Sequence, residues 1–338
     1  MIKHVFFIAV LLFALYRPSF SQKLIGQNVI TPRMRVIMDN DFSGDPDGLF
    51  ALTHLLLSPS VNVRGIIGSH LRADDGFDNS NVQAQHAAEK AREVIKALNI
   101  QSNIPVIAGS NTAMTNDSTP VTSEAVSFII KEALRTDTKQ PLYILCGAGL
   151  TEIASAVLTE PRIADKLTLI WIGGPEYTDL APPPPNYTRL EYNLNIDIAA
   201  ARVVFNKSVI PVWQVPRNAY RQAIISYSQL LSKVKPQGKI GSYLTSTLEN
   251  LMDKIQKYIN LGETYILGDS PLVLLTALQS SFEADPSSSE YVSRMAPTIN
   301  EYGMYEYNSK ARNIRVYNRL DIQLMFNDFY AKLELFNK

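Results

Sequence analysis

The chain has 338 residues, and its 32 Lys and Arg residues balance 32 Asp and Glu residues, so its formal net charge is zero. A chain of this length can bury one large core or two smaller ones. The neutral balance and the absence of a Lys/Arg-rich run argue against nucleic-acid backbone as a partner. A small neutral or polar ligand is expected instead.

The first 21 residues predict a secretory signal peptide. Lys3 and His4 precede an apolar run at 5–15, and Ser19 and Ser21 are small residues at the cleavage positions. The run is shorter than the roughly 20 residues of a membrane span. We therefore expect an exported chain, periplasmic or extracellular, that starts at Gln22 and is free of the membrane after cleavage.

An acidic stretch follows the first predicted strand, the apolar run at 36–38. Pro46 suits the first turn of the helix that comes next, and Asp45 can cap that helix. Four carboxylates stand within nine residues, at Asp39, Asp41, Asp45 and Asp47. Such dense carboxylates repel one another unless a cation lies among them, and Ca²⁺ takes several oxygen ligands, including bidentate carboxylates.

Two simpler interpretations of the acidic stretch are open. The carboxylates can cap the helix and complement its dipole without binding anything. The spacing also fits the first positions of an EF-hand loop, but that loop needs a Glu at its twelfth position, where this chain has Phe50. An EF-hand also needs a helix before the loop, where this sequence predicts a strand.

Short apolar runs then alternate with helical patterns along the chain. Further strands are predicted at 63–68, 104–108, 142–146, 167–172 and 209–215. Helices are predicted at 82–98, 123–134, 151–158 and 198–205. This alternation predicts an α/β fold with a doubly wound, mostly parallel sheet, in a single domain over 22–338. Ligands bind at the carboxyl ends of the strands in such folds, where Asp39 and Asp41 fall.

Cys146 is the only cysteine, so no intrachain disulfide can form. We expect it to be a small buried thiol at a strand end. The three histidines after the signal peptide, His54, His70 and His86, show no metal-ligand spacing, which argues against zinc.

Polar and apolar residues alternate at 190–197, after a loop that contains the stiff run Pro182 to Pro185. The alternation predicts an extended segment, on which Glu191 and Asn193 share one face. This pair suits a vicinal diol, because the carboxylate accepts hydrogen bonds from hydroxyl groups and the amide both donates and accepts them.

Two other turns precede predicted helices. The run Gly147-Ala148-Gly149 follows a strand, but Glu152 replaces the third glycine of a dinucleotide fingerprint, which leaves a tight turn with free backbone carbonyls. Asp269 precedes an apolar helix at 272–278, and a cap alone would explain it.

Taken in order, these motifs resemble the nucleoside hydrolases of the inosine–uridine preferring type. The resemblance covers about residues 33 to 337. It rests on Asp39-Asn40-Asp41 with Asp45 and Asp47, Gly147 to Ala154, Ile172-Gly173-Gly174, Glu191-Tyr192-Asn193, Asp269 to Leu272, and Asn313 to Val316 leading to Asp321.

The resemblance implies Ca²⁺-dependent hydrolysis of the N-glycosidic bond of ribonucleosides or a related N-ribosyl compound, which releases ribose and a base for nucleoside salvage. It implies that Asp41 is the general base and that water attacks the anomeric carbon of an oxocarbenium-like sugar. The implied metal ligands are Asp41, Asp47, Asp269 and the backbone carbonyl of Gly147. The implied substrate contacts are Asp45, Glu191, Asn193, Ser69, His70 and Asn186. A homodimer or homotetramer is expected.

The chain departs from the family pattern in the acidic stretch, where Pro46 separates two acids that are adjacent in the family. Counting from Asp41 favours Asp45 as the ribose-binding acid, and counting back from the helix favours Asp47 as the metal ligand. Ser69 and His70 stand where many members carry Asn. Asn186 lies one residue closer to Glu191 than the family's 5′-hydroxyl asparagine does.

The largest departure is Gly268, where many relatives carry a His that protonates the leaving base. Tyr265, Tyr302 or His70 can serve instead, or the substrate has a better leaving group. A different class of function is a non-catalytic or lapsed nucleoside-binding protein that keeps the metal site. The two hypotheses differ at Asp41, because Asp41→Asn abolishes rate only in an enzyme.

Overall fold

The structure is a computed structural model that describes residues 29–188, 190–280 and 288–338. The predicted signal peptide at 1–21 lies outside these residues. Within the described ranges, no helix combines the length and the apolar character that a membrane crossing requires.

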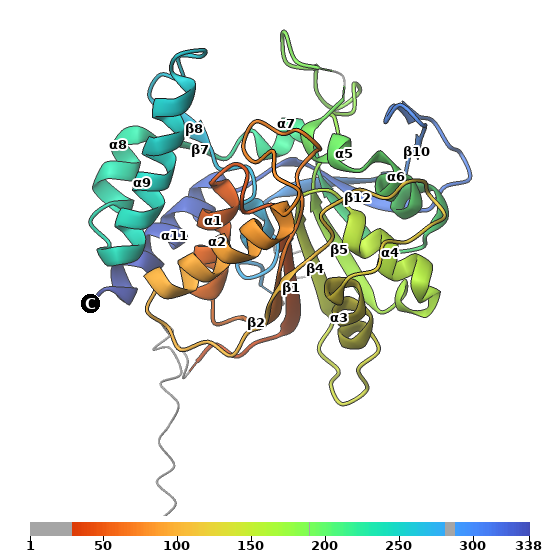
Figure 1. The fold of residues 1–338 in the computed structure, drawn as a ribbon, viewed down its shortest axis with the longest axis horizontal. Helices are drawn as coiled ribbons and strands as arrows, with labels where there is room; N and C mark the ends of the chain where they lie inside the picture. Colours follow the sequence, from red (N-terminus) through yellow and green to blue (C-terminus); the bar gives the residue numbers. More distant parts are fainter. Residues whose placement is uncertain (1–28, 189, 281–287) are drawn as a thin grey trace, which may run out of the picture.

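An eight-stranded sheet forms the centre of the molecule (Figure 1). Its order is β3 (Val106–Ala108), β2 (Val61–Gly68), β1 (Met34–Asn40), β4 (Leu142–Gly147), β5 (Leu167–Ile172), β6 (Val212–Val215), β12 (Asn313–Arg319) and β9 (Glu290–Met295). All neighbours pair in parallel except β9, which runs antiparallel to β12. The predicted α/β fold with a mostly parallel sheet is confirmed.

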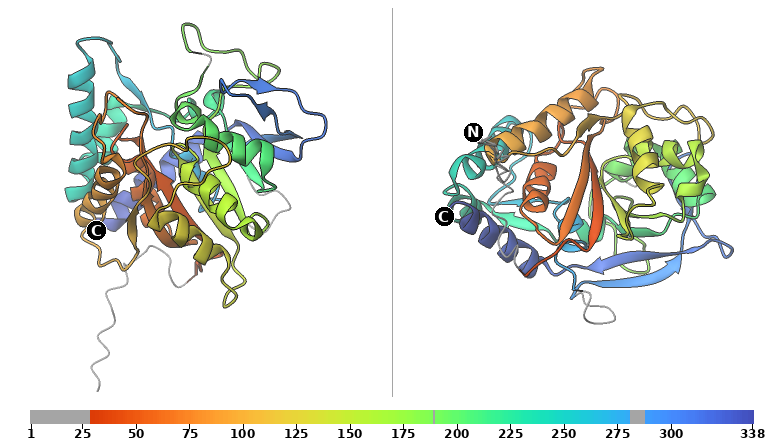
Figure 2. Two further views of the ribbon diagram at one scale, coloured as in Figure 1. Left: turned by 45° about the vertical axis from the view of Figure 1, so that its right-hand side comes forward. Right: turned by 90° about the horizontal axis from the view of Figure 1, so that it is seen from below.

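Both faces of the sheet are covered, which is why its strands are nearly continuous apolar runs. On β1, Val36 and Met38 pack into one core and Ile37 packs into the other, because successive side chains of a strand point to opposite faces. The first core includes α1 (Asp47–Leu56), α2 (Gln83–Ala97), α9 (Gly238–Ile255), α10 (Pro271–Leu274) and α11 (Ile322–Phe336). The second includes α3 (Glu124–Ala133), α4 (Thr151–Thr159) and α6 (Ile198–Arg202). Figure 2 shows these two helical layers on either side of the strands.

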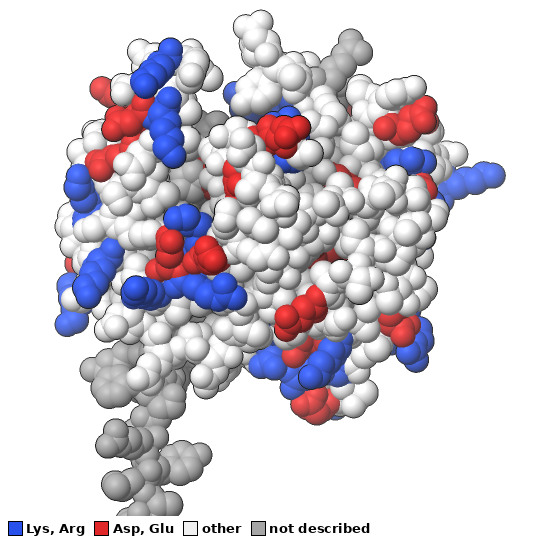
Figure 3. Space-filling model, viewed as in Figure 1, with Lys and Arg blue, Asp and Glu red and all other residues white. Residues whose placement is uncertain are grey.

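Smaller elements complete the chain. They are the 3₁₀ turn η1 (Pro161–Ile163), α5 (Tyr192–Ile196), the π-helical turns η2 (Val203–Lys207) and η3 (Leu230–Val234), α7 (Arg217–Tyr220), α8 (Tyr227–Gln229) and two small antiparallel sheets, β7 (Ile224–Ser226) with β8 (Thr264–Ile266) and β10 (Thr298–Ile299) with β11 (Tyr305–Glu306). On the face drawn in Figure 3, Lys and Arg are interspersed with Asp and Glu.

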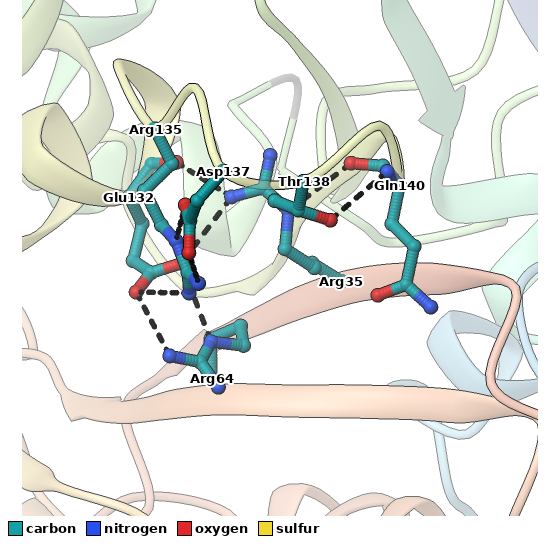
Figure 4. Close-up of polar contacts among 7 residues, drawn as sticks. All are labelled: Arg35, Arg64, Glu132, Arg135, Asp137, Thr138 and Gln140. Carbon is teal, nitrogen blue, oxygen red and sulfur yellow. Dashed lines mark hydrogen bonds and ion pairs between the residues drawn. The ribbon is translucent and has the colours of Figure 1, made fainter.

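A cluster of charged residues connects α3 to the inner strands β1 and β2, away from their carboxyl ends (Figure 4). The carboxylate of Glu132 accepts hydrogen bonds from Arg35 on β1, Arg64 on β2 and Arg135, at 3.2 to 3.3 Å. Arg35 and Glu132 are both buried. Since a buried carboxylate is costly unless it is paired, Glu132 is stable here only with its arginines.

Two predicted elements differ from the structure. The segment 190–197 is not extended: Glu191 is the N-cap of α5, and its side chain accepts from the backbone N–H of Leu194. The helix is only five residues long, and its buried residues are Asn193, Leu194 and Ile196. The predicted helix at 272–278 is α10, which ends at Leu274.

Candidate active site

A cavity of about 750 Å³ lies at the carboxyl ends of the strands. Seven of the residues that the sequence predicted for the site line it: Asp41, Asp45, Asp47, Gly147, Glu191, Asn193 and Asp269. They come from the loop after β1, the end of β4, the start of α5 and the segment before α10. The sheet thus brings together parts of the chain that are far apart in sequence.

One wall of the cavity is acidic, and its carboxylates are held by specific donors. Asp45 accepts from the backbone N–H of Asp47 at 3.3 Å and from the hydroxyl of Tyr265 at 2.7 Å. Asp47 accepts from the backbone N–H groups of Gly48 at 2.8 Å and of Asp269 at 3.1 Å. Asp45 was predicted to cap α1, but Pro46 occupies the N-cap position and no side chain of the described residues caps it; from that helix Asp45 accepts only the N–H of its first residue, Asp47.

Four acids make up this acidic wall: Asp41, Asp45, Asp47 and Asp269. Each disfavours the ionised form of the others. Burial raises the pKa of Asp41 and Asp47 well above the ordinary value, and the neighbouring carboxylates raise both further. Burial raises the pKa of Asp45 to about 6 and that of Asp269 to about 7, against the lowering effect of their hydrogen bonds. A cation on this wall would relieve the repulsion.

Asn40, the last residue of β1, connects the acidic wall to the sheet. Its amide Nδ2 donates to Oδ2 of Asp269 at 2.7 Å. Two glycines leave room for this amide: a Cβ on Gly48 would lie 2.3 Å from Oδ1 of Asn40, and one on Gly147 would lie 2.3 Å from Nδ2. Any larger residue at either position would displace Asn40, and at 147 it would also meet Asp269 at 2.5 Å.

Glu191 and Asn193 form a second polar wall from the start of α5. Glu191 Oε2 accepts from the backbone N–H groups of Gly174 at 2.7 Å and Leu194 at 3.0 Å, and its Oε1 accepts from the hydroxyl of Tyr220 at 2.9 Å. Asn193 donates to the carbonyl of Ile172 at 2.7 Å. These bonds fix both side chains at the cavity, where the second can offer its Oδ1 to a ligand.

Three residues predicted to contact the substrate do not line the cavity. Ser69 is buried and donates to Asp39. His70 is buried, and its ring nitrogens lie 2.7 Å from the carbonyl of Leu71 and 2.9 Å from the hydroxyl of Thr151. Asn186 lies on the surface in the left-handed conformation, with φ of 61°.

Other residues behind the site are internal. Oδ2 of Asp39 and Oε2 of Glu152 are buried with no partner among the described residues. Burial raises the pKa of Asp39 to about 7 and that of Glu152 to about 8. Cys146 is a free, buried thiol at the end of β4, as predicted. Tyr302, an alternative acid for the leaving group, is 70% exposed and is not among the lining residues.

Arginines on the cavity wall were missed by the sequence analysis. Arg217 donates to both carboxylate oxygens of Glu176 at 2.6 and 2.7 Å, and both residues are buried. Arg72 pairs with Asp75 at 3.0 Å. Arg221 also lines the cavity. The sequence offered one indication of these residues: Arg217 and Arg221 follow the carboxyl end of β6, which is the side of the sheet where the cavity lies.

The donor chemistry of the acidic wall fits a hard cation. The wall supplies only oxygen atoms as metal ligands, and Ca²⁺ prefers oxygen ligands. The arginines Arg72 and Arg217 on the cavity do not neutralise this wall, because they are paired with Asp75 and Glu176. Asp45, Asp47 and Asp269 accept the hydrogen bonds described above. In the described ranges, no group of three or more His, Cys, Asp or Glu side chains is arranged to hold a metal ion.

Comparison with known proteins gives a consistent result. The sequence profile of the family described as "Inosine-uridine preferring nucleoside hydrolase" matches residues 36–327. A protein described by the same words, from Leishmania major, is 39% identical over 85 residues, which is 25% of this chain and 25% of that protein. The match thus spans a quarter of that relative.

Solved structures share the fold. The purine-preferring ribonucleoside hydrolase from Gardnerella vaginalis matches with a TM-score of 0.71 and 19% identity, over 90% of this chain and 99% of that chain. A plant nucleoside hydrolase matches with a TM-score of 0.65 and 18% identity, over 89% of this chain and 99% of that chain.

Proposed function

The chain belongs to the inosine-uridine preferring nucleoside hydrolase family, and from that premise we propose that it is a Ca²⁺-dependent hydrolase of the N-glycosidic bond of ribonucleosides. The observation that carries the proposal is the pair of polar walls that face one cavity. One wall holds the four carboxylates, and the other holds Glu191 and Asn193.

Asp41 is the proposed general base. Its carboxylate lines the cavity together with those of Asp45, Asp47 and Asp269. A carboxylate in this position can take a proton from a water molecule bound in the cavity. The water attacks the anomeric carbon, the C–N bond breaks, and the anionic walls stabilise positive charge on the sugar.

The ribose hydroxyls are proposed to bind Asp45, Glu191 and Asn193. Asp45 and Glu191 accept hydrogen bonds from protein donors, and Asn193 donates one to the carbonyl of Ile172; such support keeps a binding group in position before the substrate arrives. The residues that would hold Ca²⁺ are Asp41, Asp47, Asp269 and the carbonyl of Gly147. The chemistry a bound Ca²⁺ supplies is positive charge that eases the loss of a proton from water.

We propose that the chain is exported and salvages nucleosides in the periplasm or outside the cell, as a homodimer or homotetramer. Support for export comes from the sequence at 1–21. Support for a small-molecule substrate comes from the cavity and from the interspersed charges in Figure 3. Secretion of the intact gene product tests the proposed export, and the mass of the protein in solution tests the proposed oligomeric state.

Ribose release tests the activity directly. The purified chain would be incubated with purine and pyrimidine ribonucleosides, with Ca²⁺ or with EDTA. We expect release that EDTA abolishes and that Asp41→Asn lowers by at least about 100-fold. Asp253→Asn, an exposed aspartate outside the cavity, serves as the control. No release, with ribose still raising the melting temperature, would point to a binding protein.

A further inference from the structure

Gly268 offers no general acid, and a side chain at this position would be crowded. A Cβ on Gly268 would lie 3.2 Å from Oδ2 of Asp47 and 3.3 Å from Cδ2 of Tyr220. These contacts are tighter than ordinary van der Waals distances, so Asp47 or Tyr220 would have to shift by a few tenths of an ångström. The leaving base must be activated from somewhere else on the wall.

Two tyrosines on the cavity are poor proton donors. The hydroxyl of Tyr265 already donates to Asp45, and that of Tyr220 already donates to Glu191. Burial raises the pKa of both phenols above the ordinary value, and the adjacent carboxylates raise it further. Each hydroxyl is therefore better suited to holding its carboxylate than to releasing a proton.

Arg221 lines the cavity and keeps an unpaired donor. It is half-buried, and its Nε has no hydrogen-bond partner among the described residues. No acceptor or ion-pair partner from the described ranges meets its other guanidinium nitrogens either. An unpaired buried N–H group is costly, which suggests that a ligand supplies the acceptor.

The surroundings of Arg221 leave its charge available to a ligand. The charge of Arg221 acts on Glu176. Burial would raise the pKa of Glu176, but its hydrogen bonds and the charges of Arg217 and Arg221 lower that pKa below the ordinary value. Both oxygens of Glu176 are already taken by Arg217. The guanidinium of Arg221 lies over the ring of Tyr187, 5.2 Å from its centroid, on the cavity wall.

We propose that Arg221 binds the departing base as a fixed cation and so replaces the missing general acid. This inference rests on the proposed function. Tyr220, the preceding residue, holds Glu191 on the ribose-binding wall, and Arg221 lines the same cavity.

The step balances without a protein acid. Water adds its oxygen to the anomeric carbon, and Asp41 takes the proton that the water loses. The electron pair of the C–N bond stays on the base nitrogen, and the resulting anion is held by the guanidinium until it takes a proton from solvent. The substrates are thus nucleosides whose base departs as an anion.

Two substrates separate this role from a structural one. Inosine or another cleaved nucleoside has a poor leaving group, whereas 4-nitrophenyl β-D-ribofuranoside releases a stable phenolate that needs little help. We expect Arg221→Gln to lower kcat for the nucleoside by about 100-fold, the loss that follows removal of one stabilising donor. The nitrophenyl riboside should be cleaved at a nearly unchanged rate, and Arg221→Lys should recover part of the loss.

Arg162→Gln, at an exposed ion pair with Glu160, is the control and should leave both rates unchanged.

The outcomes distinguish the two levels of the proposal. Equal losses with both substrates, or no loss with either, would overturn the role of Arg221 while the proposed hydrolysis stands. A wild-type chain that cleaves neither substrate would overturn both. An unchanged melting temperature for Arg221→Gln confirms that the comparison uses folded protein.

Discussion

The side-chain amide of Asn40 donates to Oδ2 of Asp269 at 2.7 Å, although 229 residues separate the two in sequence. This bond joins the end of β1 to the segment before α10 and lowers the pKa of Asp269, against the larger effect of burial. We expect Asn40→Ala to cost about 1 to 3 kcal/mol of unfolding free energy and to reduce ribose release. Urea unfolding and the release assay measure the two effects, with the exposed Asn116→Ala as control.

Gly147→Ala should abolish activity more than it destabilises the fold. The new Cβ would lie 2.3 Å from Nδ2 of Asn40 and 2.5 Å from Oδ1 of Asp269, so one of these side chains must move. We expect at least about 100-fold loss of kcat/KM, because small displacements at a catalytic centre have effects of this size. Gly76→Ala is the matched control, since a Cβ there meets nothing within 4 Å. Full activity of Gly147→Ala would mean that Asn40 and Asp269 need not be held together.

Ca²⁺ should raise the melting temperature, and Asp47→Asn should remove this response. A ligand at 100 times its Kd adds about 2.7 kcal/mol to stability. Without Ca²⁺, the same variant should be more stable than the wild type, since the neighbouring carboxylates repel Asp47. Thermal unfolding with and without EDTA gives both comparisons. If the variant and the wild type responded equally to Ca²⁺, the acidic wall would not be the metal site.

Tyr265→Phe tests whether this phenol positions a carboxylate or protonates the base. Its hydroxyl lowers the pKa of Asp45, against burial, so its loss should raise that pKa above about 6. The acid side of the kcat/KM profile should then move to higher pH, because Asp45 loses its charge earlier as the pH falls. KM should rise by up to about tenfold, the equivalent of one hydrogen bond. A collapse of kcat with KM unchanged would instead make Tyr265 the acid; Tyr258→Phe, 85% exposed, is the control.

Glu132→Gln should destabilise the fold without acting on the site. Burial would raise the pKa of Glu132, but its hydrogen bonds and ion pairs with Arg64 and Arg135 lower it below 4.5. Its stabilising effect is therefore present above about pH 4.5 and is lost as the pH falls through the lowered pKa. We expect a cost of about 3 kcal/mol at pH 7 and a smaller difference from the wild type in acid. Urea unfolding across this range measures it, and Glu290→Gln, at an exposed pair with Arg319, should change little.

Much of the fold could be predicted because buried parallel strands leave a simple pattern. Apolar runs form the centre of β1 at 36–38, most of β4 at 142–146 and most of β5 at 169–172, and helical patterns separate the strands. The small sheet of β7 and β8 left no such signal, since each strand has only three residues. Its formation depends on the pairing of segments about 40 residues apart.

The acidic wall was predictable for a similar reason, because carboxylates gather where β1 ends. The helical start at Glu191 was not, since five residues are too few to show a helical period. Nor could the sequence show that His70 is held by a carbonyl and by Thr151, or that Nε of Arg221 meets no hydrogen-bond partner in the part of the chain that the structure describes. Those facts depend on contacts between distant segments.

The position of β1 between β2 and β4 has a consequence for the order of folding. The chain builds outward from β1 to β3 and only then returns to place β4 on the other side of β1. Until residues 142–147 are available, one edge of a wholly buried apolar strand stays open to other chains. Refolding yield should therefore fall with protein concentration, and chains truncated before β4 should aggregate.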